Sequence, residues 1–250
     1  MLLAGLLAGC VAEAPPTDHD VLIPRLVELL NDPNPDVRQT TAMALGKIAR
    51  PQATRALVEK LRDPDPVVRR DSAWALGNLG DEVMDQVGLA LVERLGDPSD
   101  EVKTAAAQAL GAMRATPAMV ERLTATLRQA DVPTKRAAVQ ALALLEAPAS
   151  YQALVEALRH DDARIRQGAI AALGELADAR ALPLLRDRLR HDRDVGVRSE
   201  AAFRLGKFGD ATVVSALKSA AADDGDADVR RWALWAAAQL SGRGGSDSGL

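Results

Sequence analysis

Three histidines are the side chains best suited to acid–base or metal chemistry in this 250-residue chain, and each precedes an aspartate, at His19, His160 and His191. His160 and His191 both stand two residues after the last leucine of a predicted short helix, so they should lie in adjacent turns about 10 Å apart. That distance is too large for one metal ion to bind both. No serine or threonine has a companion histidine on the same predicted face, and no glycine-rich loop fits a phosphate. We therefore expect neither catalytic residues nor a metal or cofactor site.

Acidic and basic residues recur together along the chain, with an aspartate six residues ahead of a base. The pairs are Asp32 and Arg38, Asp63 and Arg69, Asp97 and Lys103, Asp192 and Arg198, and Asp224 and Arg230, and the column of bases also includes Lys135 and Arg166. These bases could form a groove for phosphate, or each could pair with the aspartate of its own turn or of the next one. We favour a structural ladder of ion pairs, because a phosphate-binding stripe would leave its bases unpaired.

Large aromatic side chains mark the best candidate for a binding surface. In most copies an aliphatic residue stands directly before the base, as Val68 does before Arg69. Six residues after this aliphatic position the seven copies have Met43, Trp74, Gln108, Gln140, Ala171, Phe203 and Trp235. Trp232 lies one helical turn before Trp235 and shares its face. Because tryptophan is enriched among the residues that dominate interfaces, we predict that Trp74, Phe203, Trp232 and Trp235 bind a partner. The alternative is that Trp74 packs between helices and that Trp232 or Trp235 covers the end of the array.

The composition indicates an all-helical protein. Alanine and leucine make up about a third of the chain and favour helix, whereas only 2% of the residues are aromatic, too few for a compact α/β or β core. The net charge of −4 disfavours nucleic-acid binding, which needs a surplus of lysine and arginine. No apolar run reaches the roughly 18 residues of a membrane-spanning helix. The single cysteine excludes an internal disulfide.

These positions belong to seven copies of one pattern between Asp20 and Leu240. Most copies begin with two leucines four residues apart, such as Leu57 and Leu61, and continue through a turn rich in Asp and Pro into a longer helix. The apolar column of this second helix contains Leu45, Leu76, Leu110, Leu142, Leu173, Leu205 and Ala237, at spacings of 31 to 34 residues. A single pair of helices cannot bury its apolar face, so neighbouring pairs must stack. The predicted fold is an all-α α-solenoid of about seven helical hairpins.

The repeated residues resemble HEAT repeats, in particular the short form of roughly 30 residues associated with phycobilin lyases. The shared features are Asp-Pro in the turn, Val-Arg at the start of the second helix and Ala-Leu-Gly farther along it, as in Asp63-Pro64, Val68-Arg69 and Ala75-Leu76-Gly77. The resemblance covers about 220 of the 250 residues. It implies that the second helix of each pair lines a concave surface. It does not identify a function, because the family includes scaffolds, lyase subunits, hydroxylases and proteins similar to DNA glycosylases.

The first ten residues, MLLAGLLAGC, end at the only cysteine. Leu7, Ala8, Gly9 and Cys10 resemble the lipobox of bacterial lipoproteins, which implies a lipid-modified Cys10 and a protein held at the bacterial cell envelope, on the outer membrane or facing the periplasm. The alternative is a cytoplasmic protein whose N-terminus is rich in Ala and Leu. We divide the chain into the remnant of a lipoprotein signal peptide (1–10), a tether (11–19), the solenoid (20–240) and a disordered tail (241–250).

Together these features predict a non-enzymatic protein–protein interaction scaffold that is anchored by lipid and binds a protein or peptide on its concave face. The repeat type also permits a chromophore (bilin) lyase or a partner subunit of one. A DNA-binding solenoid would need a basic groove, which the net charge of −4 opposes. We expect no nucleic acid, and contact with a membrane only through Cys10. The sequence leaves the oligomeric state open.

Overall fold

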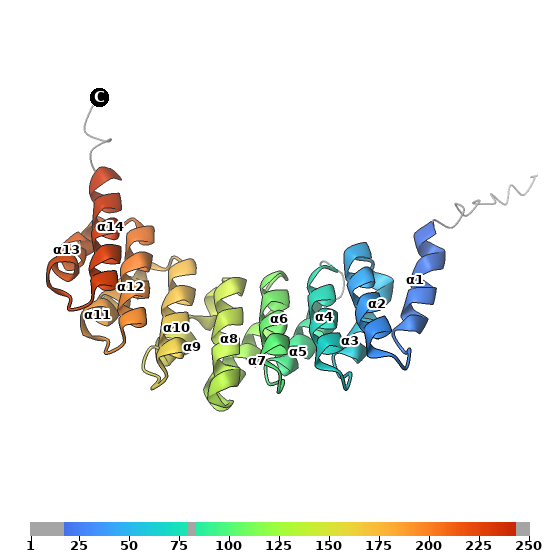
Figure 1. Ribbon diagram of the computed structural model, residues 1–250. Coiled ribbons are helices and arrows are strands. Elements are labelled where there is room, and N and C mark those ends of the chain that lie inside the picture. The colour runs from blue at the N-terminus through green and yellow to red at the C-terminus, as the bar shows by residue number, and fades with distance from the viewer. Residues whose placement is uncertain (1–17, 80–83, 244–250) are drawn as a thin grey trace, which may run out of the picture.

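The protein is a curved stack of helical pairs (Figure 1). The computed structural model describes residues 18–79 and 84–243, and fourteen α-helices but no strands occur within these ranges. Each pair consists of a first helix (helix A) and a second helix (helix B), and successive pairs pack side by side. This arrangement confirms the predicted α-solenoid of seven hairpins. Cys10 and most of the expected tether and tail lie outside the described residues.

The helix boundaries follow the repeat. The A helices are α1 (Asp18–Leu29), α3 (Thr54–Lys60), α5 (Met84–Arg94), α7 (Pro117–Gln129), α9 (Tyr151–Ala157), α11 (Leu182–His191) and α13 (Val214–Asp223). The B helices are α2 (Pro35–Ile48), α4 (Pro66–Gly77), α6 (Asp100–Gly111), α8 (Val132–Leu145), α10 (Ala163–Glu175), α12 (Val195–Phe208) and α14 (Ala227–Arg243). Short 3-10 helices at η1 (Pro51–Ala53), η3 (Pro148–Ser150), η4 (Ala179–Ala181) and η5 (Ala211–Val213) lead into α3, α9, α11 and α13. Thus α1 begins two residues before residue 20, the expected start of the solenoid, and α14 ends three residues after residue 240, its expected end.

The turns before the B helices explain where these helices begin. Asp65 accepts hydrogen bonds from the backbone N–H groups of Val67 and Val68, at 2.8 and 3.2 Å, and Pro66 follows it at the first helical position. An aspartate at this position satisfies amides that the helix itself leaves unpaired, and a proline after it loses no hydrogen bond. Asp131, Asp162 and Asp194 cap α8, α10 and α12 in the same way. The Asp-rich turns therefore fix the start of helix B in most repeats.

Small residues allow adjacent B helices to approach closely. A Cβ atom on Gly46 would lie 2.7 Å from the Cα of Ala75 in the next B helix, and one on Gly77 would lie 2.9 Å from the Cα of Ala109. No side chain fits at these two positions without a shift of the backbone. The neighbouring apolar column is buried throughout, at Leu45, Leu76, Leu110, Leu142, Leu173, Leu205 and Ala237. In the Ala-Leu-Gly segment, leucine fills the core and the small residues set the distance between repeats.

The B helices lie on the concave side of the array, and the A helices lie on the convex side (Figure 1). Side chains that point away from the core on the B helices therefore face one shared surface. None of the described helices combines the length and the apolar character that a membrane crossing requires.

Candidate functional site

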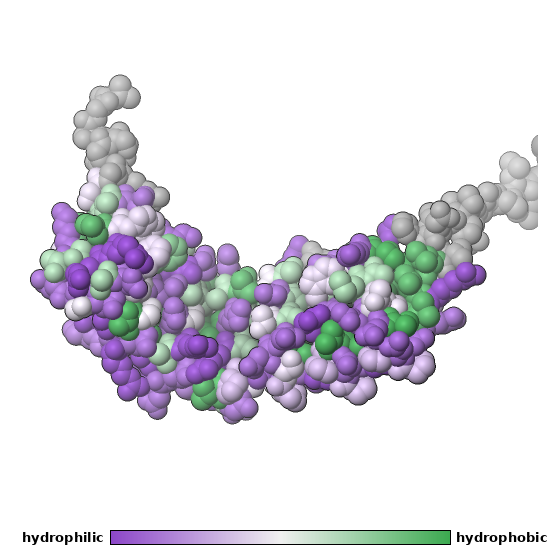
Figure 2. Space-filling model, viewed as in Figure 1, coloured by the Kyte–Doolittle hydropathy of each residue, from purple (hydrophilic) through white to green (hydrophobic). Residues whose placement is uncertain are grey.

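Three hollows follow one another along the concave face of the array. The first, of about 460 Å³, lies between α4 and α6. The second, of about 310 Å³, shares Asp100 and Thr104 with the first. The third, of about 470 Å³, reaches α12 and shares Arg136, Gln140 and Arg164 with the second. Because neighbouring hollows share lining residues, they adjoin along one face of the array, and we call them together the concave groove. The concave outline of the molecule is visible in Figure 2.

Four residues of the aromatic column defined from the sequence line this groove. Trp74 lines the first hollow together with Gln108, Gln140 lines the second and third, and Ala171 lines the third. Trp74 is 40% exposed and Trp235 is 36% exposed. One helical position therefore presents side chains to the concave surface along much of the array.

Trp74 both packs and remains accessible. A Cβ atom on Gly46 would lie 2.8 Å from Cζ3 of Trp74, so the indole rests on the preceding B helix where that helix has no side chain. Trp235 lies near Gly206 in the corresponding way, with Cζ3 at 3.2 Å from such an atom. Each ring thus has one edge against a neighbouring repeat and another part open to solvent.

Phe203, Trp232 and Trp235 form an aromatic cluster at the far end of the array. The ring centroids of Phe203 and Trp235 are 5.5 Å apart, and the rings are stacked. Trp232 meets both rings edge-on, at 5.4 Å from Phe203 and 5.7 Å from Trp235. Trp232 is partly buried against the core. This packing fits the alternative prediction, in which Trp232 or Trp235 covers the end of the array. Trp235 is the more accessible ring of the cluster.

Arginines at the start of the B helices bridge neighbouring repeats. Nε and Nη2 of Arg38 donate to the two carboxylate oxygens of Asp63, both at 2.8 Å, and its Nη1 donates to backbone carbonyls of its own turn. The same bidentate arrangement joins Arg69 to Asp97, Arg166 to Asp192 and Arg198 to Asp224. These guanidinium groups are therefore occupied by protein partners, and a phosphate groove built from them would have to break the pairs.

The carboxylates of these pairs are held in the ionised form. Burial alone would raise the pKa of Asp63, Asp97 and Asp192, but hydrogen bonds from their arginines keep each pKa below its ordinary value. For Asp224, the hydrogen bond from Arg198 is the largest cause of the lowered pKa. The ladder is thus a set of buried or half-buried charge pairs.

The ladder is interrupted in the middle of the array. Lys103 contacts Asp100 in the first turn of its own helix, at 2.8 Å. The following turn has Gln129 two residues before the capping Asp131, where most turns have an aspartate. The expectation that Lys103 pairs with a ladder aspartate is therefore corrected, because the next turn offers no carboxylate at that position.

His160 replaces the ladder aspartate in the fifth repeat. Its Nδ1 accepts a hydrogen bond from the N–H of Asp162 at 3.0 Å, as an aspartate does in other turns. Arg136, one residue after the expected Lys135, pairs with Asp162 instead. This hydrogen bond lowers the pKa of Asp162 to about 2. An ion pair thus still joins these two repeats. It uses Arg136, one residue after the usual base, and Asp162, two residues after the usual position of the aspartate.

The two ends of the ladder contact their own turns. Asp32 accepts a hydrogen bond from the N–H of Asn34 at 2.8 Å, and Arg230 donates to the carbonyl of Asp224 at 2.7 Å. Neither residue bridges to a further repeat within the described part of the chain. The ladder therefore joins the internal repeats to one another, and its first aspartate and last arginine contact only their own turns.

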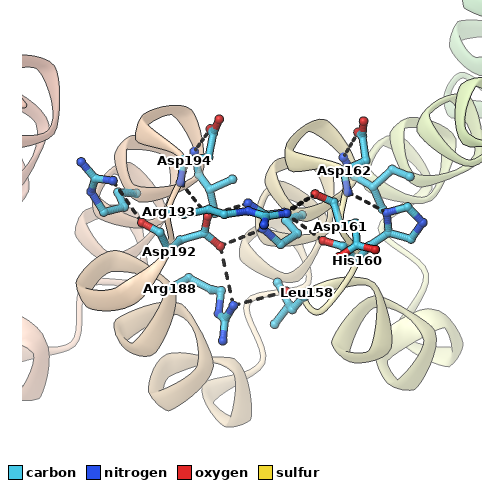
Figure 3. A network of polar contacts seen from close by, with 12 residues as sticks. Leu158, His160, Asp161, Asp162, Arg188, Asp192, Arg193 and Asp194 are labelled. Carbon is cyan, nitrogen blue, oxygen red and sulfur yellow. Dashed lines mark hydrogen bonds and ion pairs between the residues drawn. The ribbon is translucent and has the colours of Figure 1, made fainter.

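Two further arginines strengthen the boundary between α9–α10 and α11–α12 (Figure 3). Arg188 donates to the carbonyl of Leu158 at 3.5 Å and lies 3.6 Å from Asp192, and Arg193 donates to the carbonyl of Asp161 at 2.8 Å. His191 contacts Asp187 at 3.0 Å, whereas His160 contacts the N–H of Asp162, so the two histidines share no partner. Among the residues that the structure describes, no group of His, Cys, Asp and Glu could hold a metal ion.

The analysis of the sequence missed several charged residues that line the concave groove, among them Asp71, Glu101 and Arg164. Asp71 lies one helical turn before Trp74, and Glu101 and Arg164 each stand directly before the apolar residue of their repeat. Asp71 is one helical turn from the aromatic column, and Glu101 and Arg164 are two turns from it, so extending the column by two turns on each helix would have found them.

Comparison with known proteins agrees with this architecture. A family model described as HEAT repeats matches residues 23–111, 85–143, 120–204 and 160–238. No curated protein matches the chain.

Solved structures with some similarity to this chain include a lyase complex, an engineered protein and a designed repeat protein. The complex of CpcE and CpcF of phycocyanin lyase from Nostoc sp. is 22% identical over 95% of this chain and 100% of that chain, with a TM-score of 0.48. An engineered protein is 24% identical over 88% of this chain and 68% of that chain, with a TM-score of 0.50. A designed armadillo repeat protein in complex with the peptide (KR)4 is 20% identical over 87% of this chain and 99% of that chain, with a TM-score of 0.46.

The segments matched by the family model overlap and run from residue 23 to residue 238. They include residues of all seven helical pairs, from α1 to α14. Given the stacked pairs, the Asp-rich turns and these matches, the chain belongs to the family of HEAT-repeat proteins.

Proposed function

We propose that the protein is a non-enzymatic scaffold that binds an extended segment of another protein in the concave groove. The observation that carries this proposal is the groove of adjoining hollows, which has the exposed Trp74 at one end, together with the exposed Trp235 of the same helical column beyond the other end. Tryptophans at interfaces often dominate the binding energy. The architecture supports the same function, because stacked repeats create extended concave binding surfaces.

The dimensions of the groove favour a peptide over a small molecule. Trp74 on α4 and Phe203 on α12 are four repeats apart, about 40 Å at roughly 10 Å per repeat. An extended segment of about a dozen residues spans this distance, whereas a small ligand fills a single hollow. The partner we propose therefore contacts both the Trp74 region and the aromatic cluster.

Photo-crosslinking from inside the groove tests this proposal. Gln140, exposed in the middle of the groove, is replaced by p-benzoylphenylalanine, and Lys218, exposed on helix A of the last pair, is replaced in a matched control. We expect a protein adduct from position 140 that is lost when Trp74→Ala is added, and no such adduct from position 218. Equal adducts from both positions, or adducts from position 218 alone, would contradict binding in the groove.

We also propose that Cys10 carries lipid and holds the scaffold at the bacterial cell envelope. The support is the sequence Leu7-Ala8-Gly9-Cys10 and the Pro-containing segment after it. Cys10 lies outside the described residues. Metabolic labelling with an alkyne fatty acid should label the wild type in the membrane fraction and leave Cys10→Ala unlabelled and soluble. Unlabelled wild type, recovered in the soluble fraction as fully as the variant, would refute the anchor.

A further inference from the structure

The hollow between α4 and α6 contains a buried carboxylate with an unpartnered oxygen. Asp71 on α4 lines the hollow and is 6% exposed. Its Oδ1 accepts a hydrogen bond from Nε of Arg70 at 2.6 Å. Its Oδ2 is buried and has no hydrogen-bond partner among the described residues. Because a buried carboxylate oxygen without a donor is unfavourable, a donor from a ligand would stabilise this site.

An aromatic face lies beside this carboxylate. Trp74 follows Asp71 by one helical turn and lines the same hollow. Its indole rests on Gly46 of α2, and Trp74 remains 40% exposed where it lines the groove. A cation is attracted to the face of an indole ring, and more strongly when both are partly desolvated. Asp71 and Trp74 together therefore suit a positively charged side chain.

The hollow is also negatively charged as a whole. Its lining has three carboxylates, of Asp71, Asp100 and Glu101, against the one guanidinium of Arg70, a net charge of −2. Lys103 compensates Asp100, which leaves the surroundings negative. Arg70 lies 2.6 Å from Asp71 and 3.5 Å from Glu101, which shows that a guanidinium fits between these carboxylates. Glu101 is largely exposed and can turn toward a second cation.

The other described B helices lack this combination. At the position of Asp71 they have Thr40, Ala105, Ala137, Gly168, Glu200 and Trp232. Glu200 is the other acid in this column, and it already contacts Arg204 at 2.7 Å. The hollow beside Trp74 is therefore a local feature of the second repeat and is not dictated by the repeat pattern.

We propose that this hollow binds the side chain of a lysine or arginine in the segment that occupies the concave groove, an inference that rests on the proposed function. Because Oδ2 of Asp71 is enclosed in the unbound protein, its carboxylate turns toward the groove when the segment binds. The ammonium or guanidinium group then donates a hydrogen bond to Oδ2 and lies against the ring of Trp74. A neutral side chain would leave Oδ2 unpaired, and an acidic one would be repelled. The hollow thus selects one cationic residue and fixes the position of the segment along the array.

A random peptide library of about twelve residues, displayed on phage and selected on the purified protein, tests this inference. The enriched peptides are synthesised with each Lys or Arg replaced by the uncharged norleucine, and their affinities are measured for wild type, Asp71→Asn and Trp74→Ala. Lys218→Ala, at an exposed position of α13 outside the groove, is the control. Circular dichroism checks that each variant remains helical.

We expect enriched peptides with a basic residue at one fixed position, whose replacement weakens binding to the wild type by about tenfold or more. The same replacement should change the affinity of Asp71→Asn or Trp74→Ala by less than about threefold, and Lys218→Ala should behave as the wild type. Peptides that bind the groove without any dependence on a basic residue would overturn the inference and leave the proposed function standing. Their groove binding is recognised by its loss in Ala171→Trp, which fills the third hollow. No enrichment, or peptides unaffected by Ala171→Trp, would overturn the proposed function itself.

Discussion

Trp74 and Trp232 belong to the same set of predicted binding residues, yet their surroundings differ. Trp74 rests on Gly46 and opens to the groove, whereas Trp232 is partly buried against the core and against two other rings. The sequence predicts that both lie on helix B. It does not distinguish them, because the exposure of each ring depends on the neighbouring repeat, through the absence of a side chain at Gly46 and the presence of Phe203.

The two tryptophans should therefore differ in their contribution to stability. We expect Trp232→Ala to lower the free energy of unfolding by about 3 kcal/mol, because it empties a packed aromatic cluster. Trp74→Ala should lower it by about 1 kcal/mol, since much of its surface is already exposed. Urea unfolding followed by circular dichroism measures both values. A loss for Trp74→Ala as large as that for Trp232→Ala would support the packing interpretation of Trp74.

Asp71 illustrates what a repeat pattern omits. Its position on helix B follows from the sequence, but its significance comes from burial, from one unpaired oxygen and from the carboxylates of α6 on the opposite wall. These properties arise only when two repeats are stacked. A candidate site between repeats is therefore harder to predict than the helices that form it.

Pairs of helices are joined by the ladder, which has the same geometry at four boundaries, from Arg38, Arg69, Arg166 and Arg198. The co-occurrence of acid and base in the sequence predicts a ladder between turns. The exceptions at Lys103 and Arg136 arise because Gln129 and His160 stand where the next turns would have aspartate. Pairing thus depends on the residue at the next repeat as much as on the base.

Breaking one pair by removing its arginine should be costly. Arg69→Met leaves the carboxylate of Asp97 buried without its bidentate partner, and we expect the free energy of unfolding to fall by about 3 kcal/mol. The matched control is Arg62→Met, which removes a surface contact with Glu93 at 3.5 Å and should cost less than about 1 kcal/mol. Equal losses in urea unfolding would show that the ladder contributes no more than surface charges.

The ladder also predicts how stability depends on pH. The pKa values of Asp63, Asp97 and Asp192 are lower in the folded protein than the ordinary value of 3.8, so their contribution is present above that value and is lost as the pH falls below it. We expect stability to decrease steeply below about pH 4. The double variant Arg166→Met with Asp192→Leu removes one pair and should show a shallower decrease. The same slope in the wild type and the double variant would contradict this assignment.

As a whole molecule, the array is stabilised by contacts between adjacent repeats. Such an array gains its stability from nearest-neighbour interfaces, so a defect in the middle affects both halves. The fold at this scale could be predicted from the sequence because one pattern of leucines, small residues and turn aspartates recurs seven times. The course of the groove could not, because it depends on side chains that vary between repeats.

A charge in the core of the fourth pair tests the stacking. Leu142 on α8 is 1% exposed, and Leu142→Asp would bury an unpaired carboxylate at a cost of several kcal/mol. We expect chemical denaturation to show two transitions or a general loss of helix. Val132→Asp, at the exposed start of the same helix, is the control and should unfold as the wild type does. An unchanged unfolding curve for Leu142→Asp would show that Leu142 is not part of the hydrophobic core.

The central claim is that one extended segment occupies the concave groove and contacts both tryptophan regions. Isothermal titration of the segment recovered by crosslinking, against wild type, Trp74→Ala, Trp235→Ala and the double variant, tests it most directly. We predict that each single substitution weakens binding of the same segment by about 2 kcal/mol and that the double variant loses more than either. Affinity unchanged in both single variants, with the helical content of all four proteins intact, would contradict the claim.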